Sequence, residues 1–424
     1  MTKNKIIAGI ELGSSKIATI IGQISVDSVS YEKSINIVGV SAVESRGIRK
    51  GQIVNIEEAV DACVASIEGA ERMAGYNLDN AYVAIGGAHI ASQNSHGVVA
   101  VSHPEGEIGV SDVDRVVEAA SAVSLPSSRE LIHVIPREYI VDGESGVKDP
   151  IGMSGVRLEV QTHLVTASGA AVKNIKKAVN EVGVNVVELV FSGLAAGEAV
   201  LTRTEKELGC CLVDVGGGAT SIAVYTDGGL TYSGVIPIGA NNVTNDLAIG
   251  LRVSLESAEK IKLQLSESEK KKKKDKSAQS DEVDLQTFGV QDTKKVSRKT
   301  LVDGIIRPRL NEIFTMVRLQ LDKENLGVRI PSGVILSGGG AETVGAVESA
   351  RRMMSLPVRI GKPKGIGGLI DDVVSPVYAT AVGLLIYGSN EQSEEVQNPF
   401  TSKLKLPSKG IVGKIFETIK DLLP

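Results

Sequence analysis

Strand and helix patterns alternate along the first part of the chain. Residues 6–12 and 16–24 are apolar and β-prone on either side of a Gly-Ser-Ser turn, which predicts a hairpin. A third strand is expected over 35–43. Asn55, with Glu58 three residues later, predicts the start of a helix whose apolar residues recur at helical spacing. The pattern therefore predicts mixed α/β structure.

Residues 86–166 follow a different pattern. Short alternating strands are predicted at 98–101, 133–141 and 157–165, joined by Gly-rich connections, with one helix beginning near Ser111. The length of the segment is within the usual range for a domain. We predict a self-contained α+β subdomain inserted into a larger unit.

The hairpin pattern returns at residue 210. Predicted strands at 210–215 and 220–225 flank a Gly-Gly-Gly turn, and a third strand and a helix follow, as they do after the first hairpin. Glu11 and Asp214 each stand near the end of the first strand, one residue before the turn. This likeness predicts two lobes that arose by duplication of a mixed-sheet core.

The predicted organisation has six parts, the last of which is an amphipathic helix over 409–424. The first-lobe core comprises 1–85, 167–206 and 373–388, with 86–166 inserted; the second-lobe core comprises 207–260 and 332–372, with an outer subdomain at 261–331. Within the outer subdomain, the lysine-rich stretch 266–296 is expected to be a disordered loop, and Pro308 to break or kink a helix over 301–321. Residues 389–408 are polar and predict a flexible linker.

Residues 409–424 have the pattern of an amphipathic helix. At about 100° per residue the apolar side chains fall within an arc of about 140° that excludes every charge. They are Ile411, Val412, Ile415, Phe416, Ile419, Leu422 and Leu423, with Lys409, Lys414 and Lys420 outside the arc. A core helix docked on the body would show the same pattern. The polar stretch before it favours a helix at the surface of an anionic membrane.

Composition excludes several classes of function. The chain of 424 residues has a formal net charge of -5 and 3% aromatic residues with no Trp, so neither a basic field nor stacking platforms favour nucleic acid as a partner. Cys63, Cys210 and Cys211 have neither a zinc-site spacing nor an even number for disulfides. The N-terminus does not read as a signal peptide, and no apolar run reaches 18 residues. We therefore expect a cytosolic protein.

Each of the two hairpins has an acidic residue followed by a turn of small residues. Two such hairpins that face each other could bind a phosphate chain together with Mg²⁺. Gly and Ser let backbone N–H groups approach phosphate oxygens, and Glu11 and Asp214 could hold a hard cation directly or through water. The candidate nucleotide residues are Glu11, Gly13, Ser14, Ser15, Lys16, Asp214, Gly216, Gly217, Gly218, Glu259, Lys262, Gly338, Gly339 and Gly340. Neither GxxxxGK[ST] nor a GxGxxG opening a βαβ unit occurs, which disfavours P-loop and Rossmann folds.

These motifs resemble those of the actin, Hsp70 and sugar kinase ATPase superfamily and, within it, the FtsA family of bacterial cell-division proteins. The resemblance covers nearly the whole chain and implies an actin-like α/β fold with ATP and Mg²⁺ bound between two lobes. It places 13–15 and 216–218 on the phosphates and 338–340 by the adenosine. It also places Glu259 and Lys262 on the ribose and adenine, although an i,i+3 surface ion pair explains that pair equally well.

Three positions depart from the hydrolysing relatives. Ser192 stands where those relatives have a water-positioning Glu or Gln, and Ala219 and Ser221 stand where a Thr and an Asp are frequent. Water-positioning groups contribute orders of magnitude to phosphoryl transfer. The resemblance therefore implies ATP binding with slow hydrolysis at most, and no catalytic residue is assigned beyond Glu11 and Asp214 as candidates.

The resemblance also implies partners and a location. An FtsA-like protein would polymerise on the cytoplasmic face of the inner membrane, tether FtsZ filaments there and recruit later division proteins through the insertion. Lys294, Arg298 and Arg309 match the positions that take the C-terminal peptide of FtsZ. A PilM-like pilus scaffold and a sugar or acetate kinase of the same superfamily remain alternatives.

Overall fold

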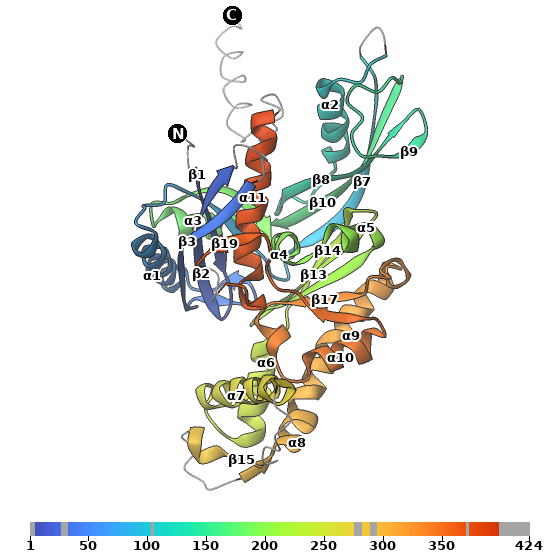
Figure 1. Ribbon diagram of the computed structural model, residues 1–424. Coiled ribbons are helices and arrows are strands. Elements are labelled where there is room, and N and C mark those ends of the chain that lie inside the picture. Colours follow the sequence, from blue (N-terminus) through green and yellow to red (C-terminus); the bar gives the residue numbers. More distant parts are fainter. Residues whose placement is uncertain are drawn as a thin grey trace, which may run out of the picture.

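Two sheets with the same topology form the two lobes in the computed structural model, which describes residues 5–26, 33–102, 106–274, 282–288, 295–369 and 373–397 (Figure 1). The first sheet has the order β11-β6-β1-β2-β3-β19 and the second β14-β13-β12-β17-β18. The first contains β1 (Lys5–Leu12), β2 (Lys16–Val26), β3 (Lys33–Glu44), β6 (Asn80–Ile85), β11 (Asn185–Phe191) and β19 (Ile366–Gly368). The second contains β12 (Cys210–Val215), β13 (Thr220–Thr226), β14 (Gly229–Ile236), β17 (Val334–Ser337) and β18 (Val358–Ile360).

Five strands of the first sheet correspond one to one with the five strands of the second, and β19 has no counterpart there. In each, three consecutive antiparallel strands are followed by two parallel ones, so that β3-β2-β1-β6-β11 matches β14-β13-β12-β17-β18. Every residue of β12 and β13 is buried, which explains why the apolar residues of these strands do not alternate with charged or exposed ones. The predicted duplication is confirmed.

Helices cover both sheets and fill the space between them. The helix α1 (Ile56–Ala74) begins at the predicted N-cap Asn55 and packs on β2 and β3, and α3 (Gly169–Asn180) packs on α1 and β11. The helix α5 (Arg203–Leu208) contacts β13 of the second sheet. The helices α4 (Ser192–Val200) and α11 (Ala379–Gln397) pack on each other; α11 lies on β1, β2 and β6, and α4 contacts β12 and β13. A short hairpin, β4 (Ile48–Arg49) and β5 (Gln52–Ile53), precedes α1.

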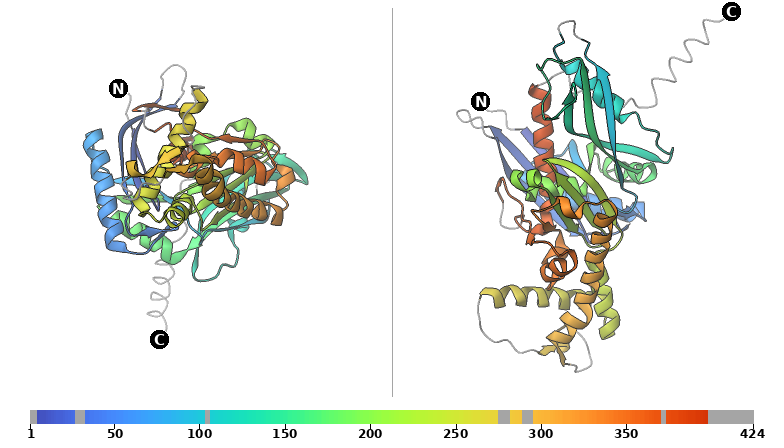
Figure 2. Two further views of the ribbon diagram at one scale, coloured as in Figure 1. Left: turned by 90° about the horizontal axis from the view of Figure 1, so that it is seen from below. Right: turned by 90° about the vertical axis from the view of Figure 1, so that its right-hand side faces the viewer.

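The insertion has its own sheet and core. Its strands have the order β7-β10-β8-β9 and run over Ala91–Ala100, Arg157–Ser168, Arg129–Val141 and Glu144–Val147. The helix α2 (Val110–Ser121) covers one face through Val116 and Ala120, which pack with Leu158 and Val160. In Figure 1 and the right view of Figure 2 the insertion lies at the opposite end of the molecule from α7. The predicted α+β insertion is confirmed.

The outer part of the second lobe is more regular than expected. It contains most of α7 (Leu255–Lys274), α8 (Arg298–Leu301), a π-helical turn (Val302–Ile306) and α9 (Arg307–Lys323), with strands β15 (Glu282–Asp284) and β16 (Lys295–Ser297). The helices α6 (Ala240–Leu251) and α10 (Ala346–Met354) lie in the range predicted as the second-lobe core. The expected loop over 266–296 is wrong where α7 continues to Lys274 and where β15 and β16 pair. Lys and Glu have high helix propensity. The Ser266 hydroxyl donates a hydrogen bond to the Lys262 carbonyl and accepts one from the Val344 N–H, which attaches the helix to the rest of the lobe.

Pro308 has the predicted effect on the helix around it. Because its nitrogen carries no hydrogen, it stands in the first turn of α9, directly after the π-helical turn that separates α9 from α8. The expected linker over 389–408 is wrong for 389–397, since α11 continues to Gln397. Gly388 lies against the Tyr82 ring and Ser389 is buried, and these contacts carry the helix into the polar stretch.

Gly383 allows the close crossing of α11 and α4. A Cβ at this position would lie 1.7 Å from the Ala195 carbonyl oxygen, which is backbone and can move only with α4. Gly383→Ala is therefore expected to lower the free energy of unfolding by more than about 3 kcal/mol. Gly304→Ala is the control, because nothing lies within 4 Å of its Cβ position. Chemical denaturation measures both, and equal losses would contradict this packing.

Candidate nucleotide site

Three glycine-containing loops surround a cavity of about 360 Å³ between the lobes. They are the β1–β2 turn (13–15), the β12–β13 turn (216–218) and the segment after β17 (338–340). The cavity lining includes every candidate nucleotide residue from the sequence: Glu11, Gly13, Ser14, Ser15, Lys16, Asp214, Gly216, Gly217, Gly218, Glu259, Lys262, Gly338, Gly339 and Gly340. The structure thus brings the whole predicted set together.

The two hairpin turns approach each other across the cavity. A Cβ at Gly218 would lie 2.8 Å from the Ser14 hydroxyl oxygen, and one at Gly217 would lie 2.9 Å from the Ser15 Cβ. The Ser14 hydroxyl accepts a hydrogen bond of 2.9 Å from the N–H of Gly51, which follows β4. Glycine is required in the second turn because the loops of the two lobes meet there.

The third loop packs on the end of β12. Gly338 has φ +78° and ψ 169°, a region open essentially to glycine alone, and its Cβ position lies 2.5 Å from the Val215 carbonyl oxygen. Gly340 is equally close to the Val215 side chain, at 2.3 Å. Gly339 is different, since its nearest neighbour is 4.0 Å away.

The two acids have different surroundings. Glu11 forms an ion pair of 2.8 Å with Lys16, whose ammonium also lies 4.8 Å from the centre of the Tyr378 ring. Asp214 is buried and accepts a hydrogen bond of 3.3 Å from Thr380 at the start of α11. Burial, and then the negative charge of Glu11, raise the pKa of Asp214 from 3.8 to about 7.

Asp214 has the features of a cation ligand. Its Oδ1 atom is buried and has no hydrogen-bond partner among the described residues. Mg²⁺ is typically held by one or two carboxylates together with phosphate oxygens and water, so Glu11 and Asp214 fit that ion. No group of three or more His, Cys, Asp or Glu side chains in the described part of the chain could enclose a metal by itself.

Replacing Asp214 with Asn should raise the stability of the folded protein and weaken its binding of Mg²⁺-ATP. Because the pKa of Asp214 is higher in the folded chain than in the unfolded chain, ionisation destabilises the fold, and this loss grows as the pH rises from about 4 to 7. Asp214→Asn should therefore raise the free energy of unfolding of the nucleotide-free protein at pH 8 by up to about 4 kcal/mol, with no gain at pH 4. The same variant should bind Mg²⁺-ATP more weakly. Denaturation at the two pH values, with calorimetric titration of nucleotide, tests both effects.

Glu259 and Lys262 line the cavity, and the burial of Lys262 means that they are not the surface pair that their spacing also allowed. They form an i,i+3 ion pair of 2.7 Å on α7. Lys262 is buried and also donates to the Thr244 hydroxyl at 2.9 Å. The pair is thus part of the cavity wall, held from α6.

The positions that depart from hydrolysing relatives lie together in the cavity. The Ser192 and Ser221 hydroxyl oxygens are 2.9 Å apart, and Ala219 is close by in the lining. Hydroxyls that bond each other hold a water molecule less firmly than a carboxylate or carboxamide would. The Ser192 hydroxyl is therefore already engaged by Ser221.

The expected partner residues have neighbours within the chain. Arg309 donates to both carboxylate oxygens of Asp246, at 2.6 and 2.9 Å, and also pairs with Glu312. Arg298 donates to the Leu265 carbonyl at 2.9 Å. Lys294 and the candidate membrane helix 409–424, with its apolar face and lysines, lie outside the described residues.

Known proteins match this chain over most of its length. The model "SHS2 domain inserted in FTSA" matches residues 87–166, and "Cell division protein FtsA" matches 211–383. Cell division protein FtsA of Pseudomonas aeruginosa is 39% identical over 390 residues, which cover 92% of this chain and 91% of that protein. The Bacillus subtilis protein is 38% identical, with 91% and 84% covered. This chain belongs to the FtsA family.

Solved structures show the fold of this FtsA-family protein to be actin-like. A chain of the PilM-PilN type IV pilus biogenesis complex aligns with a TM-score of 0.62 at 16% identity, over 90% of this chain and 98% of that one. MreB5 of Spiroplasma citri bound to ADP aligns with a TM-score of 0.52 at 13% identity, over 93% and 99%. At such identities the PilM likeness extends to the fold alone. The FtsA relatives favour cell division over the pilus and kinase alternatives.

Several residues of the site were not among the sequence candidates. Thr380 comes from the start of α11, and Tyr378 from the 3-10 turn Pro376–Tyr378 just before it. Asn241, whose N–H donates to the Gly217 carbonyl at 2.8 Å, comes from the start of α6. No helix in the described ranges is long and apolar enough to cross a membrane.

Proposed function

We propose that this protein binds ATP with Mg²⁺ between its lobes, polymerises on the cytoplasmic face of the inner membrane and tethers FtsZ filaments there. One observation carries the proposal: two duplicated turns converge on a cavity that Asp214 lines, and the buried Oδ1 atom of Asp214 has no hydrogen-bond partner within the described part of the chain. Relatives that are cell-division proteins and MreB5, a fold neighbour solved with ADP and with AMPPNP, support it.

Different residues of the cavity would contact different parts of the nucleotide. Bound Mg²⁺-ATP would supply a phosphate chain that joins the lobes. The turns 13–15 and 216–218 would receive the phosphates through backbone N–H groups other than those of Gly13 and Gly216, which donate to the Lys16 and Ala219 carbonyls, and Glu11 and Asp214 would receive the cation. Lys16, Glu259 and Lys262 provide further polar contacts, and 338–340 forms the wall by the adenosine. With Ser192 and Ser221 bonded to each other, hydrolysis would be slow.

For the FtsZ peptide we propose Lys294, Arg298 and Arg309 as the residues that bind it. Because Arg309 is bound by Asp246 and Glu312, an acidic peptide would have to compete with these carboxylates for the guanidinium. The ion pairs of Arg309 would then set the affinity of the site.

Because of this competition, substitutions at Asp246 and at Arg309 should change the affinity for the peptide in opposite directions. Asp246→Asn should tighten binding of an FtsZ C-terminal peptide about three- to tenfold, because it removes a competing charge, whereas Arg309→Ala should weaken it by a similar factor. Fluorescence anisotropy with labelled peptide measures both. Unchanged affinity in both variants would place the peptide elsewhere.

Sedimentation with liposomes tests the whole proposal. Full-length protein should sediment with anionic liposomes, form polymers on them when ATP and Mg²⁺ are added, and bring FtsZ down with it. Recruitment of FtsZ should fail when either liposomes or this protein is omitted. Membrane binding without recruitment of FtsZ would contradict the tether.

A further inference from the structure

The insertion forms hydrogen bonds with the second lobe, although in the sequence it interrupts the first lobe. The contact is with β14, the edge strand of the second sheet. The Ser92 hydroxyl, on β7, donates to the Ser233 carbonyl at 2.8 Å and accepts from the Ser233 N–H at 3.1 Å. One side chain thus satisfies both backbone groups of a residue on the open edge of the sheet.

A second set of bonds extends this contact. Asn94, on β7, donates from Nδ2 to the Thr231 carbonyl at 3.3 Å. The His163 ring, on the neighbouring strand β10, lies between Asn94 Oδ1 at 2.8 Å and the Ser233 hydroxyl at 3.0 Å. We call Ser92, Asn94, His163, Thr231 and Ser233 together the β14 latch.

The hydrogen-bond directions in the latch are fixed. Because Asn94 uses its amide group on Thr231, its oxygen accepts from His163 Nδ1–H, and His163 Nε2 then accepts from the Ser233 hydroxyl. His163 and Ser233 are each 1% exposed, so water cannot replace these bonds unless the contact opens.

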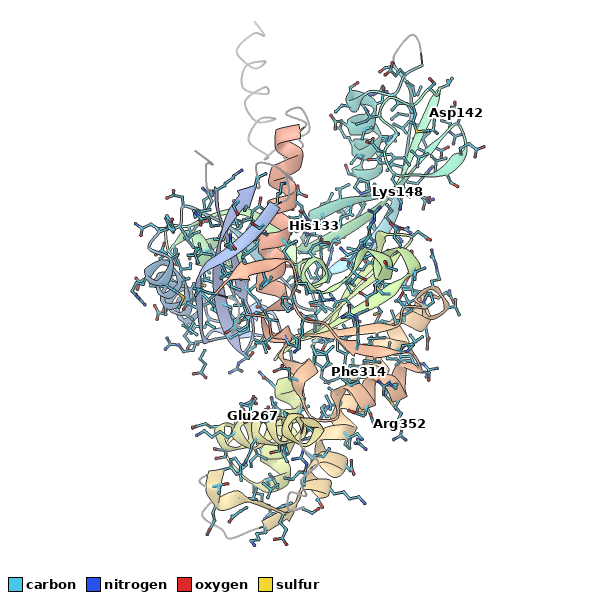
Figure 3. All side chains as sticks on the ribbon, in the orientation of Figure 1. His133, Asp142, Lys148, Glu267, Phe314 and Arg352 are labelled. Carbon is cyan, nitrogen blue, oxygen red and sulfur yellow. The ribbon has the colours of Figure 1, made fainter. Side chains whose placement is uncertain are left out.

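The insertion is also fixed to the first lobe. His133 on β8, placed where the insertion meets α11 in Figure 3, accepts the Phe191 N–H at 2.9 Å and pairs with Glu188. Glu188 also accepts from the Tyr387 hydroxyl of α11 at 2.9 Å. The insertion is therefore held by both lobes, and a change in the angle between them must strain one attachment.

A change in the angle between the lobes would alter the nucleotide cavity, because the cavity lies between them. The turn 216–218 joins β12 to β13, and β13 pairs along its length with β14, so the second sheet moves these parts together. The latch forms here in the arrangement in which 216–218 meets Ser14 and Ser15. Its bonds therefore favour the convergence of the turns that a phosphate chain requires.

We propose that the β14 latch couples nucleotide binding to the position of the insertion. The coupling rests on the proposed binding of ATP between the lobes. By linkage it acts in both directions: nucleotide keeps the latch closed, and a closed latch increases affinity for nucleotide by the same factor. A ligand that pulled the insertion from β14 would weaken nucleotide binding.

The first test removes the latch hydroxyl. Ser92→Ala should weaken binding of AMPPNP with Mg²⁺ about tenfold, since two buried backbone groups of Ser233 lose their partner. Ser92→Thr keeps the hydroxyl and should restore affinity. The control is Ser95→Ala, the same change on the other face of β7. Affinity in Ser92→Ala equal to that in Ser95→Ala would overturn the coupling.

The second test needs no variant. Hydrogen exchange followed by mass spectrometry on wild-type protein should show slower exchange in the peptide covering 229–236 when AMPPNP and Mg²⁺ are added, because the Ser233 N–H exchanges only when the latch opens. Unchanged exchange in protein that binds the nucleotide would overturn the coupling alone. If wild-type protein bound no nucleotide, both the coupling and the proposed function would be overturned.

Discussion

Replacing Gly338 with alanine is expected to reduce ATP affinity at least tenfold and to lower the free energy of unfolding by about 2–4 kcal/mol. Two independent effects produce this result. The backbone at Gly338 lies at φ +78°, where an L-residue is strained, and the new Cβ would lie 2.5 Å from the Val215 carbonyl oxygen. The loop must move, and it cannot move without displacing the end of β12, which also carries Asp214.

Gly304 provides the control, because it lies outside the cavity lining. Its Cβ position has no neighbour within 4 Å and its φ is not positive, so Gly304→Ala should fold normally and bind ATP within about twofold of wild type. Titration of a fluorescent ATP analogue, with denaturation curves for both variants, measures the contrast. Equal affinity in the two variants would show that the third loop does not shape the nucleotide site.

The features predictable from sequence are those encoded within short segments. Each hairpin carries its own turn signal and strand period, so the duplicated lobes, the acids Glu11 and Asp214 and the three glycine loops could be inferred before the structure. The insertion could be recognised because its strand spacing differs from that of the lobes. In all these cases the residues that determine the element are neighbours in the sequence.

The features that escaped prediction depend on contacts between distant segments. Thr380 lies 166 positions after Asp214 and reaches it from the start of α11, and neither residue type signals the pairing. The β14 latch joins Ser92 to Ser233 across 141 positions, through side chains that are common on any strand surface. Likewise, the low-complexity composition of 266–274 concealed a helix, because Ser266 is anchored by a residue of another segment, Val344.

Removing residues 409–424 is expected to abolish sedimentation of the protein with anionic liposomes. The prediction rests on the sequence pattern of these residues. Seven apolar side chains on one face of a helix could contribute on the order of 5–10 kcal/mol on entering the membrane interface, less the cost of ordering a short helix. Nearby lysines add about 1 kcal/mol each at most.

The form of the loss distinguishes a membrane helix from a segment that docks on the body of the protein. A membrane helix makes Phe416→Asp almost as damaging to liposome binding as the deletion, while the free energy of unfolding in solution stays unchanged. A docked segment would instead show reduced stability in both variants and no change in sedimentation. Single helices of this kind bind reversibly, so wild-type sedimentation should rise steeply with protein concentration as polymers present many copies at once. A wild-type isotherm without this rise would mean that each protomer binds the membrane alone, and the polymer would then have no part in anchoring.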